Sequence, residues 1–134
     1  MKYFLPLLAL GFAGCVSHQF SQPQGTWKTR TGQLLYREGG RSIVGELTVS
    51  TLGKDGRLEF SKGAALALMR IQRDASHARF EGPLARLAHT VSLPASPGSR
   101  EAGWMTVMDR AATEQSYSVG SGGAQFSVQF SGGR

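Results

Sequence analysis

The chain has 134 residues and a formal net charge of +6, from 15 lysines and arginines against 9 aspartates and glutamates. This length suffices for one domain with one core and is too short for two. The 18 glycines are spread along the chain, which favours many turns between short strands over long helices. Because the basic residues form no dense run, we interpret the charge as a solvated surface and do not expect nucleic acid as a partner.

The first residues have the pattern of an export signal. Lys2 precedes an apolar stretch of about eleven residues, whereas a transmembrane helix needs roughly twenty. Phe12-Ala13-Gly14-Cys15 follows and contains the only cysteine. This motif resembles the lipobox of bacterial lipoproteins, although Phe12 stands where that family usually has an aliphatic residue. The resemblance implies that residues 1–14 are a signal peptide, cut before Cys15, and that the Cys15 thiol carries a diacylglyceryl (palmitate-type) lipid.

Ordinary signal cleavage is the alternative, because Ala9 and Gly11 fit a small-x-small pattern. Cys15 would then be an unpaired thiol in an oxidising compartment, where it has no partner for an internal disulfide. Lipidation is therefore preferred. Val16 follows the cysteine, and by analogy with enteric bacteria the lack of an Asp there favours the outer membrane, with the protein lipid-anchored on its periplasmic face.

Residues 15–25 are polar and without periodicity, so we expect a lipidated tether in which His18 has no chemical role. From residue 26 the chain alternates apolar and polar side chains, as strands do. Gly39-Gly40 and Lys54-Asp55-Gly56 mark turns between them. The strands of this antiparallel meander are predicted at Thr26–Tyr36, Ser42–Leu52, Arg57–Phe60, Ala64–Gln72 and His77–Glu81.

The segment Leu84–Leu93 fits both a helical stripe and a strand; we favour a strand, because Pro83 and Pro94 bracket it at a strand's length. After it, Ser99 is a helix N-cap candidate for residues 100–112. Trp104, Met108 and Ala111 would share one face of this helix, joined by Met105 and Ala112. Two last strands are expected at Gln115–Val119 and Ala124–Phe130.

These elements predict an α+β fold that is mostly antiparallel β, with residues 26–134 as one domain. The expected architecture is a curved sheet or half-barrel of about eight strands, covered by one helix. An acyl chain fits such a cup if the interior is incompletely filled, while a closed core is an equally weighted alternative. The predicted apolar cup consists of Leu66, Leu68, Met69, Phe80, Trp104, Met105 and Met108.

Three segments carry a second resemblance: residues 45–49 (Gly-Glu-Leu-Thr-Val), residues 57–60 (Arg-Leu-Glu-Phe) and residues 78–84 (Ala-Arg-Phe-Glu-Gly-Pro-Leu). In them the chain is similar to the LolA/LolB-like periplasmic lipoprotein carriers and related small lipoproteins. The similarity covers about half of the mature chain. It implies a half-barrel with a helical lid that binds the acyl chains of lipoproteins.

Sequence motifs of hydrolases, metalloproteases and nucleotide-binding enzymes are absent. His77 and His89 could approach each other, with Asp74 or Glu81 nearby, but two histidines alone make a poor metal site, so no metal or cofactor is predicted. The leading hypothesis is a non-enzymatic envelope lipoprotein that binds an acyl chain or a lipidated client. The alternative is a structural or assembly accessory of an envelope protein complex, and an enzyme is a distant third.

Overall fold

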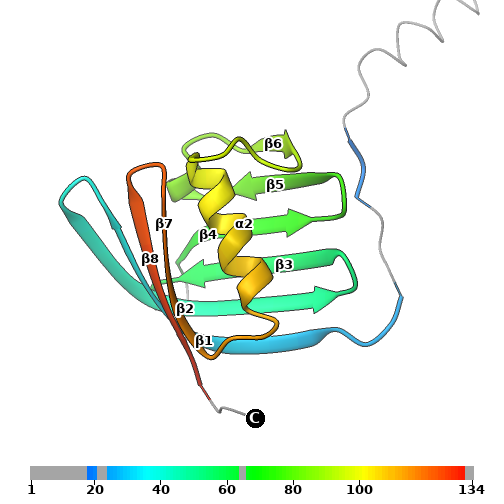
Figure 1. Ribbon diagram of the computed structural model, residues 1–134, viewed down its shortest axis with the longest axis horizontal. Coiled ribbons are helices and arrows are strands. Elements are labelled where there is room, and N and C mark those ends of the chain that lie inside the picture. The colour runs from blue at the N-terminus through cyan, green and yellow to red at the C-terminus, as the bar shows by residue number, and fades with distance from the viewer. Residues whose placement is uncertain (1–17, 21–23, 64–65, 132–134) are drawn as a thin grey trace, which may run out of the picture.

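The computed structural model describes residues 18–20, 24–63 and 66–131. These residues form one unclosed sheet of eight antiparallel strands, in the order β6-β5-β4-β3-β2-β1-β8-β7, and one α-helix lies across it (Figure 1). The predicted curved antiparallel sheet with one covering helix is confirmed. The strands are β1 (Lys28–Glu38), β2 (Arg41–Leu52), β3 (Asp55–Ser61), β4 (Ala67–Arg73), β5 (His77–Glu81), β6 (His89–Ser92), β7 (Ser116–Ser121) and β8 (Ala124–Phe130).

Strand β1 joins the two parts of the sheet. It pairs with β2 through the tight turn at Gly39 and Gly40, which both have positive φ, and on its other edge with β8 from the end of the chain. The β1 and β8 partners, such as Gly32 and Phe130, are far apart in sequence. No local pattern in the sequence predicts this pairing.

One face of the sheet carries the core. Along β8, Phe126, Val128 and Phe130 are buried while the residues between them are exposed, as the period of two requires. The helix α2 (Arg100–Arg110) buries Trp104, Met105, Val107 and Met108 against this face. Burying these large apolar side chains stabilises the layered arrangement by about 1.5–3 kcal/mol for each.

Helix α2 begins where the sequence predicts. The Ser99 hydroxyl accepts a hydrogen bond from the Ala102 amide, and Glu101 lies in the first turn, where the helix dipole favours a negative charge. The helix ends at Arg110, two residues before the predicted end, and Ala112 is exposed beyond it.

The predicted strand at Leu84–Leu93 is wrong over its first half. Pro83 instead begins a short 3-10 turn, η1 (Pro83–Ala85), and Arg86 follows it with a φ of 66°. Proline suits the first position of a helical turn because it has no N–H to donate. Only His89–Ser92 remain as strand β6. In β4, pairing starts at Ala67, so Leu66 precedes the strand, and Ala64 and Ala65 lie outside the described residues.

Candidate functional site

The predicted apolar cup is filled by its own side chains. Six of its seven residues, all but Leu66, belong to the buried core; Leu66 is 50% exposed. Met69, Phe80 and Trp104 border a cavity of about 30 Å³, which has room for about one water molecule. The space between α2 and the sheet at these residues therefore holds side chains where an acyl chain was expected.

A larger opening lies at the end of the sheet where α2 finishes. One hollow of about 770 Å³ has Val49, Leu52 and Ala112 among its lining residues. A second, of about 390 Å³, shares Ala112 with the first and also touches Met108 and Lys54. We call the two together the tether-end groove. Met108 is the one residue of the predicted cup that lines it.

The cations of the tether-end groove fall into two kinds. Arg30 donates hydrogen bonds to the Ala111 and Glu114 carbonyl oxygens, at 2.7 and 2.8 Å, and Arg73 pairs with a carboxylate. Lys28 and Lys54 also line the groove, and among the described residues neither forms an ion pair. Asp55 also lines the second hollow and forms no ion pair among the described residues, so a ligand would meet two lysines and one carboxylate, a net positive charge.

The N-terminal segment passes this same end of the sheet. Gly25 lies so close to the turn between β2 and β3 that a Cβ built on it would be 3.2 Å from Leu52. His18 contacts the turn between β4 and β5 through Asp74. Both turns lie at the side of the sheet where residues 18–20 and the segment leading into β1 lie (Figure 1). The described residues of the tether, 18–20 and 24–25, thus lie at the same end of the molecule as the groove.

His18, Asp74 and His77 form a compact cluster in which each offers a metal-ligand atom within 4.8 Å of the others. His18 Nε2 lies 2.7 Å from Asp74 Oδ2, and the His18 and His77 rings stack at 3.8 Å between centroids. Burial acts to raise the pKa of Asp74, but hydrogen bonds from the Ser76 amide, the His18 ring and the His77 amide outweigh it and hold that pKa well below its usual range.

The cluster differs from the pair of histidines considered from the sequence. His77 lies opposite Ser92 in the sheet, whereas His89 lies opposite Phe80 and stacks on its ring, so these two histidines do not meet. His18 takes that place and lies among residues with no strand pattern. Only its residue type could have suggested it, since a histidine in a polar segment carries no positional signal.

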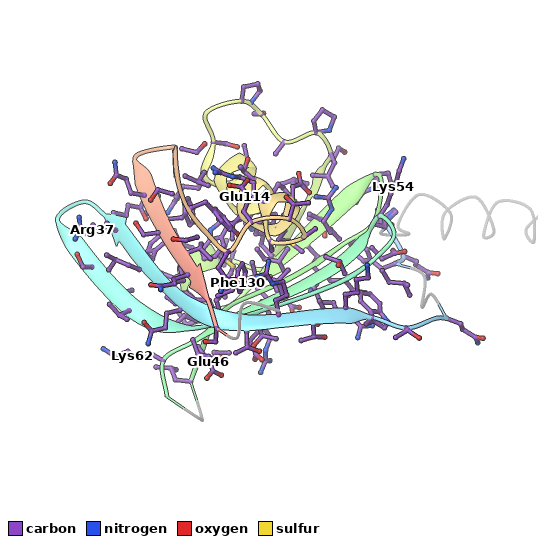
Figure 2. The ribbon with its side chains drawn as sticks, turned by 60° about the horizontal axis from the view of Figure 1, so that its bottom comes forward. Arg37, Glu46, Lys54, Lys62, Glu114 and Phe130 are labelled. Carbon is purple, nitrogen blue, oxygen red and sulfur yellow. The ribbon has the colours of Figure 1, made fainter. Side chains whose placement is uncertain are left out.

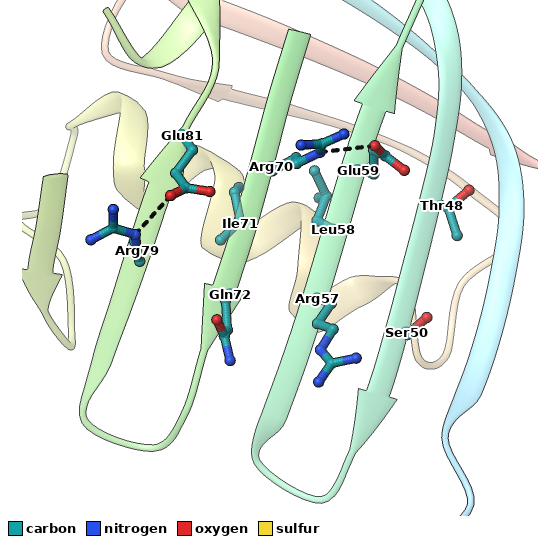
Figure 3. Close-up of a pocket in the computed structure, with 10 residues that line it drawn as sticks. All are labelled: Thr48, Ser50, Arg57, Leu58, Glu59, Arg70, Ile71, Gln72, Arg79 and Glu81. Carbon is teal, nitrogen blue, oxygen red and sulfur yellow. Dashed lines mark hydrogen bonds and ion pairs between the residues drawn. The ribbon is translucent and has the colours of Figure 1, made fainter. Parts of the chain in front are cut away.

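The outer face of the sheet is polar and forms a shallow hollow of about 370 Å³ across β2 to β5 (Figure 3). Its charges are paired: Arg70 with Glu59 at 3.0 Å, and Arg79 with Glu81 at 2.9 Å. The guanidinium of Arg57 lies over the Trp27 ring. Exposed ion pairs of this kind are typical of a solvated face, so we assign no chemistry to this hollow.

Comparison of the chain with protein-family models, with curated proteins and with solved structures finds no match. Within the described residues, no helix has the length and apolar character needed to cross a bilayer. The predicted signal peptide and Cys15 lie outside the described residues.

Proposed function

We propose that the protein is a non-enzymatic lipoprotein of the cell envelope, anchored through Cys15 to the periplasmic face of the outer membrane. In this proposal it holds the acyl chain of a lipid or of a lipidated client in the tether-end groove. The site thereby differs from the predicted cup, whose side chains pack against one another, and retains Met108 from it.

The observation that carries the proposal is the shared position of tether and groove. His18 contacts Asp74, and Ala75 beside it lines the groove. Cys15 precedes His18 by three residues, which span at most roughly 11 Å. A lipid on Cys15 would begin within that distance of His18, so the groove would lie close to the bilayer surface. Lipid anchoring would in turn raise the effective concentration of membrane ligands at the groove.

The chemistry of the groove suits an amphiphile. Val49, Leu52 and Ala112 supply apolar surface, and the unpaired Lys28 and Lys54 outnumber the one unpaired carboxylate, Asp55, so the lining has a net positive charge. Its two hollows fall within or near the range of roughly 300–1,000 Å³ typical of small-molecule sites. A lipid with an anionic head group would bury its acyl chain against the apolar residues and place its negative charge near the two lysines.

The filled core supports a second candidate function. Trp104, Phe60 and Phe126 are at most 2% exposed, as in a closed structural domain. Such a domain would serve as an assembly accessory and would dock on an envelope complex through the free edge of β7, which pairs only with β8 in this sheet. Lipid extraction separates the two: co-purifying acyl chains support the groove, and a lipid-free protein supports the accessory.

The anchor is tested by metabolic labelling with a fatty acid, comparing the wild type with Cys15→Ala. We expect label on the wild type and none on the variant. Equal labelling of both proteins, or none on either, would refute the anchor.

The groove is tested with a fluorescent fatty acid and a form that begins at Ser17, which retains every element of the structure. Ala112→Trp would fill the groove, while Ala88→Trp places the same side chain at an equally exposed alanine in the connection between η1 and β6. We expect at least a tenfold weaker affinity from Ala112→Trp, about 1.4 kcal/mol, and no change from Ala88→Trp. Equal binding by all three proteins would refute a ligand in this groove.

A further inference from the structure

The proposed function uses the contact of His18 with Asp74 only to locate the N-terminal segment, and it assigns no chemistry to the stacked histidines beside the turn between β4 and β5. We propose that His18, Asp74 and His77 bind one divalent transition-metal ion of the zinc class, which fastens the N-terminal segment to the body of the protein. This site requires neither the lipid nor an occupied groove.

The carboxylate of Asp74 is held in a fixed orientation. Its Oδ1 accepts hydrogen bonds from the Ser76 amide at 2.9 Å and from the His77 amide at 2.8 Å. These bonds leave Oδ2 directed at His18, 2.7 Å from its Nε2. A carboxylate that is positioned by backbone amides can bind a metal without losing further side-chain freedom.

The hydrogen bonds of His77 favour metal binding as well. Its Nδ1 lies 2.9 Å from the Ser76 hydroxyl, which in turn donates to Asp74 Oδ1. A proton on Nδ1, donated to that hydroxyl, leaves a lone pair on Nε2. Metal-bound histidines usually make such a second hydrogen bond through the nitrogen that does not bind the metal.

The three groups are of the types that bind zinc, and they lie near the spacing of a zinc site. Two imidazoles and one carboxylate are a common zinc set, and bond lengths near 2.0–2.2 Å imply ligand atoms roughly 3.3 Å apart. The ligand atoms here lie within 4.8 Å of one another, so side-chain rotations that shorten the longest separation by up to about 1.5 Å would close the site. The carboxylate and His18 are 18% and 24% exposed, which leaves a path for the ion.

The remaining described histidine provides a contrast. His89 Nε2 lies 3.0 Å from a Glu101 oxygen, and its Nδ1 lies 2.7 Å from the Leu87 carbonyl oxygen. Both ring nitrogens of His89 therefore have hydrogen-bond partners. No third metal-ligand group lies near His89 in the described part of the chain. His89 is a matched control for the loss of one histidine.

A bound metal would attach the tether to the body of the protein at a defined point. A metal bound by His18 and by the turn between β4 and β5 joins residues 56 positions apart. In combination with the proposed lipid at Cys15, the ion would fix the point where the anchor leaves the domain. The orientation of the domain on a membrane would then depend on the metal.

The test is calorimetric titration of the full chain with zinc chloride in detergent micelles, with Cys15→Ser in every protein so that no thiol can bind. We expect one ion per chain, released by a chelator. His18→Gln, Asp74→Asn and His77→Gln should each weaken binding at least about tenfold, and His89→Gln should leave it unchanged. Because His18 lies outside the sheet, His18→Gln preserves the fold, which its melting temperature would verify.

Two results would overturn the proposal: no zinc binding by the Cys15→Ser chain, or binding that His18→Gln leaves intact. The first would make the contact of His18 with Asp74 a simple ion pair. The second would place any bound metal elsewhere. Neither result bears on fatty-acid labelling of Cys15, so failure of this site and failure of the lipid anchor are distinguishable.

Discussion

Gly103 controls how closely α2 approaches the sheet. A Cβ at this position would lie 2.7 Å from a ring atom of Phe126 and 3.0 Å from the Ser121 Cβ. Alanine in a helix is favoured over glycine by about 1 kcal/mol, but overpacking of a filled core costs about 1–3 kcal/mol. These two effects leave a net loss of about 0–2 kcal/mol, so we expect Gly103→Ala to lower the free energy of unfolding by about 1 kcal/mol in urea titrations.

Gly120 is the matched control for this substitution. It has no positive φ, and a Cβ built on it meets nothing within 4 Å. Gly120→Ala should change stability by less than about 0.5 kcal/mol. If the two substitutions had equal effects, the packing of α2 on the sheet would not depend on the lack of a side chain at Gly103.

Tyr36 should make the free energy of unfolding fall as the pH rises in the alkaline range. Burial and a hydrogen bond to Glu38 raise its pKa to about 12 from 10.0. Between these values the unfolded chain loses the proton and the folded chain keeps it, so stability falls as the pH rises, by about 1.4 kcal/mol per unit for this group. Tyr117 is also buried with a raised pKa. We expect unfolding measured from pH 9 to 12 to show a smaller fall in Tyr36→Phe and the smallest in the double Phe variant.

At the scale of elements, Arg30 attaches the end of α2 to β1. Its guanidinium donates to the Ala111 and Glu114 carbonyl oxygens and to Gln115 Oε1, and it lies 4.4 Å from the centroid of the Phe130 ring. Charged hydrogen bonds to helix-end carbonyls contribute about 1.5–3 kcal/mol each before solvent exposure reduces them. Arg30→Met should therefore lower the free energy of unfolding by about 2 kcal/mol.

Chemical denaturation would measure this loss against Arg37→Met. Arg37 is exposed on the same strand and forms no ion pair among the described residues. Its substitution should stay within about 0.5 kcal/mol of the wild type. If Arg30→Met were as mild, the helix end would be held by core packing alone.

The elements that the sequence predicts well are those with a local signal. Strict alternation located β8 at Ala124–Phe130, and a polar cap followed by an apolar stripe located α2. The strand prediction for Leu84–Leu93 is wrong over its first half because a proline at the start of a 3-10 turn and a proline beside a strand look alike in sequence. Alternation also does not indicate which strands pair, so the pairing of β1 with β8 could not be predicted from the sequence.

The candidate site was less predictable for the same reason. Of the seven apolar cup residues all but Leu66 are buried, but a sequence cannot show whether an interior is filled. The cluster of His18 with Asp74 and His77 joins a segment without periodicity to a distant turn. The groove depends on where α2 ends, two residues before the predicted end.

At the scale of the whole molecule, positive charge lies at both ends of the sheet. Lys54 lies at the end where the N-terminal segment arrives, and Arg37 and Lys62 lie at the opposite end (Figure 2). Under the proposed anchor only the first end would face the bilayer. A lysine near an anionic surface contributes about 1 kcal/mol to membrane binding, and one beyond the Debye length contributes little.

Binding of the form beginning at Ser17 to phosphatidylglycerol vesicles would test which end faces the membrane. We expect Lys28→Glu with Lys54→Glu to weaken binding at least about tenfold at low salt, since two attractions of about 1 kcal/mol each become repulsions. Arg37→Glu with Lys62→Glu makes the same change in net charge at the far end and should have a much smaller effect. Equal losses in both double variants would mean that net charge alone drives the association, and the membrane-facing groove would lose its electrostatic support.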